Sequence, residues 1–273
     1  MNRLFVAYKP AGIGSNLFLS KLKRKYQVKK AGFSGTLDPF AKGVLVIGFG
    51  THTKLFRFLN KVPKTYRATL WLGAKSDSLD TEMIEEVNIL EPFAQERILA
   101  AVKSLEGELE YEPPIFSAKK IDGQRAYDLA RAGKKVELNK IRSTIYKMKL
   151  LHYCHPFVTF EATVSEGTYI RSLGLMIAKK LGVQEGSLSA LERLCEGQFV
   201  YEDEKALDIK NSLALKQNYY LGDPKNLEYG RVLALEDFKV QNAGTYFVDN
   251  GKNISIITIT EGSVQYELGK IEC

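Results

Sequence analysis

Apolar residues in this chain recur in short runs, and most runs have the length and spacing of β-strands. The segment from Thr65 to Gly73 alternates, with apolar side chains on one face. The run from Val44 to Phe49 is almost wholly apolar, which is typical of a buried strand. Further strands are expected at 4–8, within 147–164 around Pro156, and at 254–260. The pattern therefore predicts a protein built around β-sheet.

Helical spacing occurs at fewer places. Phe18, Leu22 and Tyr26 lie four residues apart on one stripe, which predicts an amphipathic helix there. Ser15 or Asn16 can cap the first turn of this helix. Further helices are predicted at 95–105, 125–131 and 169–181, and a short one around Leu188, Leu191 and Leu194.

Alternating strands and helices with hairpin-like turns favour an α+β fold. Asp249-Asn250-Gly251 is a strong hairpin signal just before the β-branched run at 254–260. We therefore expect two domains: a main domain over 1–227 and a small β-rich C-terminal domain over 228–273.

Charge is distributed unevenly along the 273 residues. Residues 1–75 hold 15 Lys and Arg against one acid, Asp38, whereas the remainder carries a net charge of −7. Such asymmetry indicates a polyanion bound to the N-terminal third, although a solvated basic face without a partner is the alternative. The densest basic cluster follows the first helical stripe and comprises Lys21, Lys23, Arg24, Lys25, Lys29 and Lys30.

Several classes of protein are disfavoured by the sequence. No apolar stretch approaches the 18 residues of a membrane span, and the apolar N-terminal run is too short for a signal peptide. The three scattered cysteines fit reduced thiols in a cytoplasmic protein. We expect no metal at His152-Tyr153-Cys154-His155, which lacks a second ligand pair. We also expect no nucleotide cofactor, since neither G-x-G-x-x-G after a strand nor a P-loop is present.

Asp38 is the first candidate for chemistry. It lies in a tight loop between Gly32 and Pro39 and is surrounded by positive charge in the sequence. That charge predicts a lowered pKa for Asp38 unless burial overrides it. An ionised carboxylate there can act as nucleophile or base, and a turn former or a cap is the equally good structural alternative.

A family resemblance carries the interpretation further. The stretch from Gly32 to Leu45 reads GFSGTLDPFAKGVL and resembles G-H-T-G-x-L-D-P-x-A-x-G-V-L, a signature of the TruB family of tRNA pseudouridine synthases. Other segments resemble family motifs in the same order: Lys9-Pro10-Ala11-Gly12, Lys64-Thr65-Tyr66 with Leu72-Gly73, Pro113-Pro114 with Ser117-Ala118-Lys119-Lys120 and Gly123, Gly167-Thr168-Tyr169-Ile170-Arg171-Ser172-Leu173, and more weakly Leu191 with Arg193, Gly197 and Phe199.

The resemblance implies a fold, a reaction and a set of site residues. The fold would be a bent, mostly antiparallel mixed sheet flanked by helices, and the reaction the isomerisation of uridine 55 in the T-loop of tRNA. Asp38 would be the catalytic aspartate, paired with Arg171 through a bond that could be bidentate. Tyr66 would stack on the target base and help to remove its C5 proton. The remaining substrate-binding residues would be Tyr169, Leu191, Lys64 and Phe33.

Some features of the sequence depart from the family pattern and keep alternatives open. Phe33 and Ser34 stand where the family has His and Thr, Gly14 replaces Thr, and Ser187 stands where many members have His. The C-terminal segment is also short for a full RNA-binding domain. The alternatives are a non-catalytic tRNA-binding or RNA-folding chaperone and an enzyme acting on uridine in another RNA. We expect a monomer bound to the T-stem-loop.

Overall fold

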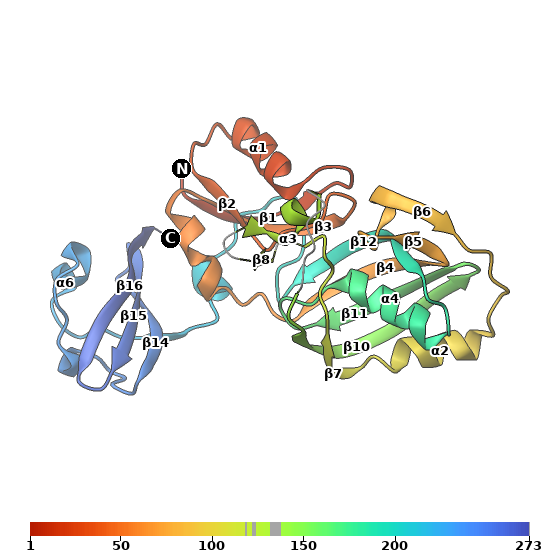
Figure 1. Cartoon of the computed structure of the whole chain (residues 1–273). Coiled ribbons are helices and arrows are strands. Elements are labelled where there is room, and N and C mark those ends of the chain that lie inside the picture. Colours follow the sequence, from red (N-terminus) through yellow and green to blue (C-terminus); the bar gives the residue numbers. More distant parts are fainter. Residues whose placement is uncertain (118, 122–123, 132–137, 273) are drawn as a thin grey trace.

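The computed structural model describes residues 1–272 except 118, 122–123 and 132–137. Ala118 and Gly123 of the predicted motif, and Cys273, therefore lie outside the described residues. The rest of the chain forms a large mixed sheet with helices and a smaller C-terminal sheet at one end of the molecule (Figure 1). This arrangement agrees with the α+β prediction.

The main sheet has eight strands, and antiparallel pairs dominate it. One pair, β3 with β12, is parallel over a short stretch. In spatial order the strands are β1 (Arg3–Lys9), β3 (Lys42–Phe49), β12 (Gly186–Glu196), β4 (Lys64–Leu72), β11 (Phe157–Val164), β10 (Ile141–Cys154) and β7 (Gly107–Tyr111), and β2 (Ala31–Ser34) pairs with β3.

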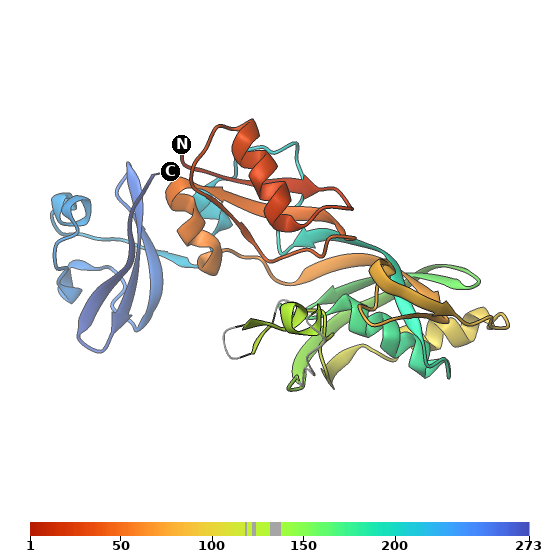
Figure 2. The ribbon, with the colours of Figure 1, turned by 45° about the horizontal axis from the view of Figure 1, so that its top comes forward.

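Strand β3 is buried on both faces, which accounts for its apolar run. Leu45 and Ile47 pack against Phe18 and Leu22 of helix α1 (Ser15–Lys25), as the helical stripe predicted. Val46 points to the opposite core. Helix α1 therefore lies over the end of the sheet formed by β1, β2 and β3 (Figures 1 and 2).

Two further helices cover the other end of the sheet. Helix α4 (Ile170–Lys180) packs on β4 and β12, and α2 (Gln95–Lys103) packs on β10. Both were predicted within a few residues. The other short elements are η1 (Gly50–Phe58), β5 (Ala74–Ser76), η2 (Thr81–Met83), β6 (Ile84–Val87), β8 (Lys120–Ile121), β9 (Gln124–Arg125) and α3 (Ala126–Arg131).

The predicted helix around Leu188, Leu191 and Leu194 is wrong, because this segment is strand β12. Its pairing with β4 is irregular after Leu188 and again after Arg193. Such β-bulges insert an extra residue and allow side chains three apart to share a face. Leu188 and Leu191 are both buried for this reason, so a strand here imitates helical spacing.

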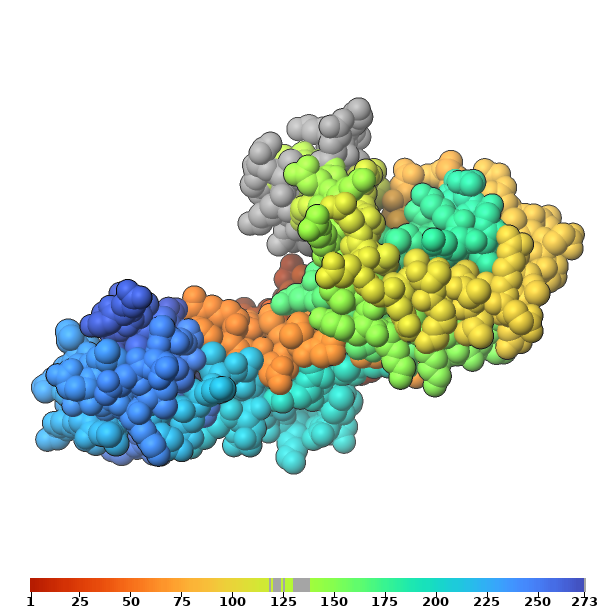
Figure 3. Space-filling model, turned by 90° about the horizontal axis from the view of Figure 1, so that it is seen from below, coloured from red at the N-terminus to blue at the C-terminus, as the bar shows by residue number. Residues whose placement is uncertain are grey.

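The C-terminal sheet packs against the main domain. Ile254 and Ile256 share a core with Val46 of β3 and Leu55 of η1, and Figure 3 shows the blue C-terminal residues against the orange surface of η1. Its elements are β13 (Lys216–Asn218), β14 (Gly244–Asp249), β15 (Asn253–Thr260) and β16 (Ser263–Glu272), with α5 (Ile209–Ser212), α6 (Pro224–Tyr229) and η3 (Leu235–Asp237) nearby.

The hairpin predicted at Asp249-Asn250-Gly251 joins β14 to β15. Because β13 already belongs to this sheet, we propose a domain boundary before Lys216 in place of the expected one after residue 227. Within the described residues, no helix has the length and apolar character needed to cross a membrane.

The stability of a Gly43 variant tests the close parallel contact between β3 and β12. The φ of Gly43 is +121°, and a β-carbon there would lie 2.3 Å from the carbonyl oxygen of Arg193. We expect Gly43→Ala to lower the free energy of unfolding by about 2 kcal/mol or more, because both strain and backbone overlap result. Chemical denaturation of the purified variant measures this change.

The control is Gly269→Ala in exposed β16, where a β-carbon would meet only Tyr266 at 3.9 Å. That variant should unfold with nearly the wild-type free energy. Equal stability of the two variants would contradict a close contact at Gly43.

Candidate active site

The loop between β2 and β3 carries Asp38, and its start requires glycine. The chain leaves β2 at Ser34 and turns at Gly35, whose φ is +68°. A β-carbon at Gly35 would lie 3.2 Å from Nζ of Lys64, so the conformation and the available space both favour glycine. At the other end of the loop, the amide of Ala41 donates to the Asp38 carbonyl over 3.1 Å. These constraints give Asp38 a fixed backbone position.

Ser15 ties helix α1 to this loop. Its hydroxyl donates to the Leu37 carbonyl oxygen (2.9 Å) and accepts from the Leu37 amide (3.0 Å). The predicted cap of α1 by Ser15 or Asn16 is therefore wrong: the N-cap residue is Gly14, and no side chain caps the helix. The first turn of the basic helix is thus bonded directly to the residue before Asp38.

Arg171 approaches Asp38 from the first turn of α4. Nε of Arg171 lies 2.9 Å from Oδ2 of Asp38, so the predicted ion pair is present. Nη1 donates to the carbonyl oxygen of Ser78 (2.6 Å), and Nη2 donates to that of Phe116 (2.9 Å). The contact with Asp38 thus uses one N–H, so the bidentate form is wrong. Backbone carbonyls hold the rest of the guanidinium group.

Asp80 is a second carboxylate at Arg171 that the sequence reading missed. Its side chain is almost completely buried, and Oδ2 lies 3.6 Å from Nη1 of Arg171. Oδ1 accepts from the Ser78 hydroxyl (2.6 Å) and from the Glu82 amide (3.0 Å). The signal available in the sequence was the group of polar residues Ser76, Asp77, Ser78 and Asp80 shortly after a predicted strand.

The Asp38 carboxylate is reachable but poorly solvated. Its side chain keeps 34% of its surface exposed, so a ligand can touch it. Burial nevertheless raises the pKa of Asp38, and the Asp80 charge adds to that rise, whereas Arg171 and Lys9 act against it. The pKa of Asp38 is therefore not lowered: the exception that the sequence analysis allowed applies, because burial overrides the positive surroundings.

Lys9 lies fully buried behind the loop. Its Nζ donates to the carbonyl oxygens of Pro10 (3.0 Å), Ile13 (2.7 Å) and Pro39 (3.4 Å). Burial lowers the pKa of Lys9 to about 8, although the Asp38 charge opposes this change. Lys9 therefore fixes the backbone on the far side of Asp38.

A cavity of about 380 Å³ opens beside Asp38. It brings together Asp38, Arg171 and four other residues that the resemblance implied, namely Lys64, Tyr66, Tyr169 and Leu191. Its volume lies in the range of small-molecule sites and suits one nucleotide base. The Asp38 carboxylate and the ring of Tyr66 thus line one cavity.

The pairing of β4 with β12 builds the floor of this cavity. Tyr66 is the direct cross-strand neighbour of Arg193, and Lys64 is the neighbour of Glu196. The bulge after Arg193 places Glu196 on the same side of the strand as Arg193. Burial raises the pKa of Tyr66, although Arg193 opposes this rise, so the phenol stays protonated near neutral pH.

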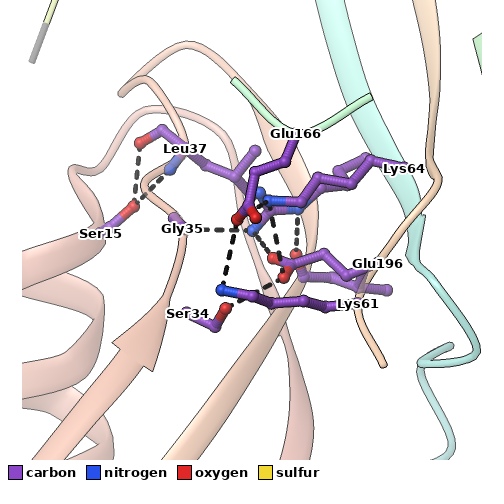
Figure 4. A network of polar contacts seen from close by, with 10 residues as sticks. Ser15, Ser34, Gly35, Leu37, Lys61, Lys64, Glu166 and Glu196 are labelled. Atoms are coloured by element: carbon purple, nitrogen blue, oxygen red, sulfur yellow. Dashed lines mark hydrogen bonds and ion pairs between the residues drawn. The ribbon is translucent and has the colours of Figure 1, made fainter. Parts of the chain in front are cut away.

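A buried ion-pair network lies beneath the floor and braces the Asp38 loop (Figure 4). Arg193 is fully buried, and its guanidinium donates to the carbonyl oxygens of Val44 (2.9 Å) and Gly35 (3.2 Å). It also lies 2.6 Å from Oε1 of Glu196. Glu196 in turn accepts from the Ser34 hydroxyl over 3.3 Å. Burial raises the pKa of Glu196 despite these partners.

Phe33 does not line the cavity that holds Tyr66. It lines a second cavity of about 300 Å³ on another side of the Asp38 loop, together with Asn16, Ser117 and Tyr127. Asp38 and Arg171 border both cavities. Phe33, which replaces the family His, thus shares a cavity with Asp38 but does not line the cavity that contains Tyr66.

The predicted basic cluster lies on α1 and the segment that follows it. Five of the six residues are exposed or partly exposed and form no ion pair within the part of the chain that the structure describes, namely Lys21, Lys23, Arg24, Lys29 and Lys30. Lys25 is different, because its Nζ lies 2.6 Å from Glu204. Among the described residues, none of the six lines either cavity at Asp38.

His155, one of the residues considered for a metal, has both ring nitrogens close to other groups. Nε2 of His155 lies 2.7 Å from the Leu90 carbonyl oxygen, and Nδ1 lies 3.1 Å from the Tyr153 hydroxyl. In the described part of the chain, no group of three or more His, Cys, Asp or Glu side chains is arranged to hold a metal ion.

Comparison with known proteins places this site in context. The chain matches the model of the TruB family pseudouridylate synthase (N terminal domain) over residues 23–170. A protein from Sulfurimonas denitrificans named tRNA pseudouridine synthase B is 72% identical over 273 residues, which is the full length of both chains. One of the same name from Campylobacter jejuni is 48% identical and covers 100% of this chain and 99% of its own.

Solved structures agree at the level of the fold. A chain in the crystal structure of a Cbf5-Nop10-Gar1 complex superimposes with a TM-score of 0.70 at 19% identity, over 97% of this chain and 84% of that one. Family match, relatives and fold are consistent with one another. The chain belongs to the TruB family of pseudouridylate synthases.

Proposed function

We propose that this protein is a tRNA pseudouridine synthase that isomerises uridine 55 in the T-loop of tRNA, with Asp38 as the catalytic carboxylate. The observation that carries the proposal is the Asp38–Arg171 ion pair at the edge of a cavity that Tyr66 also lines. Relatives that match over their full length carry the name tRNA pseudouridine synthase B, which supports this activity.

The target uridine must leave its RNA stack before Asp38 can reach it, at a cost of a few kcal/mol. Stacking on an aromatic side chain returns about 1–3 kcal/mol per base. We assign this role to Tyr66, with Tyr169 and Leu191 as the other pocket walls. Because burial keeps the Tyr66 phenol protonated, we assign it stacking and not removal of the C5 proton.

The reaction breaks the bond from C1′ to N1 and forms a bond from C1′ to C5 within one nucleotide. N1 gains a proton and C5 loses one, so no external oxidant or reductant takes part. We assign to Asp38 the role of nucleophile or base toward the flipped nucleotide. Its raised pKa strengthens the carboxylate in both roles, and Arg171 fixes its direction.

We assign RNA backbone contacts to the basic residues of α1 and the segment after it. Phosphate contacts of this kind orient the RNA and give salt-sensitive affinity without reading sequence. Lys25 has to exchange its bond with Glu204 to take part. We propose that the enzyme acts as a monomer in the cytoplasm on the T-stem-loop, and the free thiols of Cys154 and Cys195 fit a reducing compartment.

The alternative is a tRNA-binding or RNA-folding chaperone without catalysis, which Phe33 and Ser34 favour because they replace the family His and Thr. The Ser34 hydroxyl donates to Glu196. This alternative keeps RNA binding but requires no ionised Asp38.

Replacement of Asp38 by Asn separates the two functions. We expect Asp38→Asn to lower pseudouridine formation in a T-stem-loop transcript by at least about a thousandfold, because the nucleophile or base is lost. RNA affinity should change little. Release of tritium from [5-³H]uridine in the RNA measures the reaction, and filter binding measures affinity.

The matched control is Asp77→Asn, which makes the same chemical change at an exposed position. It should retain wild-type activity. If the wild-type protein binds the transcript and leaves its uridine unchanged, the chaperone is the correct function.

The pH profile tests the role of Arg171. Because the pKa of Asp38 is raised, kcat/KM should fall with decreasing pH at a pH above the ordinary aspartate value. In Arg171→Gln this acid limb should move to still higher pH, since the cation that favours the carboxylate is lost. We also expect kcat to fall about a hundredfold, the scale of a misplaced reacting group.

Arg171→Lys keeps the charge and should leave the acid limb nearer to the wild-type position. An acid limb that does not move in Arg171→Gln would contradict the assigned pairing during catalysis.

Asp38 should also cost the protein stability. A pKa raised in the folded state means that folding favours the protonated carboxyl, so the ionised form destabilises at neutral pH and acidification relieves this cost. We therefore expect Asp38→Asn to have a Tm at or above that of wild type at neutral pH. The difference should shrink as pH falls through the pKa of Asp38. Calorimetry between pH 4 and 8 checks this sign, and a clearly lower Tm at neutral pH would contradict it.

A further inference from the structure

Two lysines, of which Lys64 lines the cavity beside Asp38, share one anionic partner. Nζ of Lys61 and Nζ of Lys64 lie 3.2 Å and 3.5 Å from the same oxygen, Oε1 of Glu166 (Figure 4). Lys64 begins β4, and Glu166 lies in the loop from β11 to α4. Two ammonium groups directed at one oxygen form the arrangement that also binds a phosphate oxygen.

The lysines and the glutamate differ in exposure. The Lys61 and Lys64 side chains keep 18% and 7% of their surface exposed, whereas that of Glu166 keeps 53%. A cation as buried as Lys64 needs a counter-charge, because desolvation without one is costly. The nearby carboxylate of Glu196 lies 3.9 Å from Lys64 but only 2.6 Å from Arg193. Glu166 is therefore the main exposed counter-charge of the two lysines.

The charge of this cluster favours an anion in place of Glu166. The cluster contains three cations, Lys61, Lys64 and Arg193, and two carboxylates, Glu166 and Glu196. With Glu166 turned away, two positive charges remain uncompensated. The two lysines lower the pKa of Glu166 although its partial burial opposes this, so the carboxylate is charged at neutral pH.

The Glu166 carboxylate can turn away from the lysines into solvent, because about half of the surface of its side chain is already exposed. Lys64 and Glu166 both line the cavity beside Asp38. An RNA strand that delivers a nucleotide into this cavity has to pass its phosphates close to Glu166.

We propose that Lys61 and Lys64 form a binding site for one backbone phosphate of the substrate RNA, which Glu166 occupies in the RNA-free protein and vacates when RNA binds. This inference rests on the proposed function, because it requires an RNA nucleotide in the cavity. Glu166 then compensates the buried lysines before binding and competes with the phosphate during binding.

The test is RNA affinity of Glu166→Gln across a range of salt concentrations. Loss of the competing charge should tighten binding of a T-stem-loop transcript about two- to fivefold at low salt, the scale of one partly exposed ion pair. The slope of log K against log salt should become steeper by up to about 0.9, the scale of one ionic contact, because RNA no longer has to break the Lys–Glu166 ion pairs, which themselves weaken as salt rises. Weaker binding, or an unchanged slope, would overturn the proposal.

Glu161→Gln is the matched control. Glu161 lies on β11 and pairs with Arg67 of β4 at 3.7 Å, so this variant makes the same change of net charge and also frees a cation of β4. It lies outside the residues that line the cavity. Glu161→Gln should increase RNA affinity less than Glu166→Gln does. Equal increases would show that affinity depends only on net charge and would overturn the proposed phosphate site.

Lys61→Met supplies a second test. It should weaken RNA binding and make the salt slope shallower, and in its background Glu166→Gln should give less than half of its former gain. A full gain in that background would overturn the two-lysine site.

All binding measurements are repeated in the Asp38→Asn background, so that they do not depend on turnover. If wild-type protein forms no pseudouridine but the affinity shifts appear, the proposed reaction fails and the phosphate site stands. If pseudouridine forms and the shifts are absent, the phosphate site fails and the reaction stands.

Discussion

The candidate active site depends on one buried guanidinium held between two carboxylates. Arg171 contacts Asp38 at 2.9 Å and Asp80 at 3.6 Å, and its other N–H groups donate to the carbonyls of Ser78 and Phe116. Because Asp80 and the carbonyls fix the cation, its direction does not depend on Asp38. Asp38 can therefore be partly exposed, with a raised pKa, and still point in one direction. A flexible lysine in this place would not give the same restraint.

The second constraint is the pairing of β4 with β12. The register sets Tyr66 beside Arg193 and Lys64 beside Glu196, so the floor of the cavity and the charges beneath it come from one pair of strands. Arg193 then reaches the carbonyl of Gly35 and joins this floor to the Asp38 loop. A buried ion pair is weak evidence for stability, but loss of one partner leaves an uncompensated charge. We infer that the network serves alignment of the loop with the floor more than stability.

The sequence predicted much of the fold, since local patterns reflect burial directly. The apolar run of β3 indicated a buried strand, and the alternation of β4 marked its buried face correctly. Strand β12 was mistaken for a helix because two bulges give it a spacing of three. Strand β2 was read as a loop, since Gly32 and Gly35 lie in or beside it.

The sequence identified several residues of the candidate site, but it did not predict most of the contacts between them. The family motif located Asp38 and Arg171, and their pairing followed. The roles of Asp80, Arg193 and Glu196 depend on which strands are neighbours, which no local pattern states. The direction of the Asp38 pKa depended on burial in the finished fold, so counting nearby charges in the sequence gave the opposite sign.

The two hydrogen bonds between Ser15 and the Leu37 backbone fix the distance between the basic helix and Asp38. The basic surface of α1 lies at one end of this distance and the Asp38 carboxylate at the other. The Ser15 hydroxyl connects the two through its bonds to the backbone of the Asp38 loop. Under the proposed function, an RNA whose phosphates contact α1 would present to Asp38 only the nucleotide that lies at the matching distance along its fold. The three-dimensional shape of the RNA would then contribute to the selection of the target.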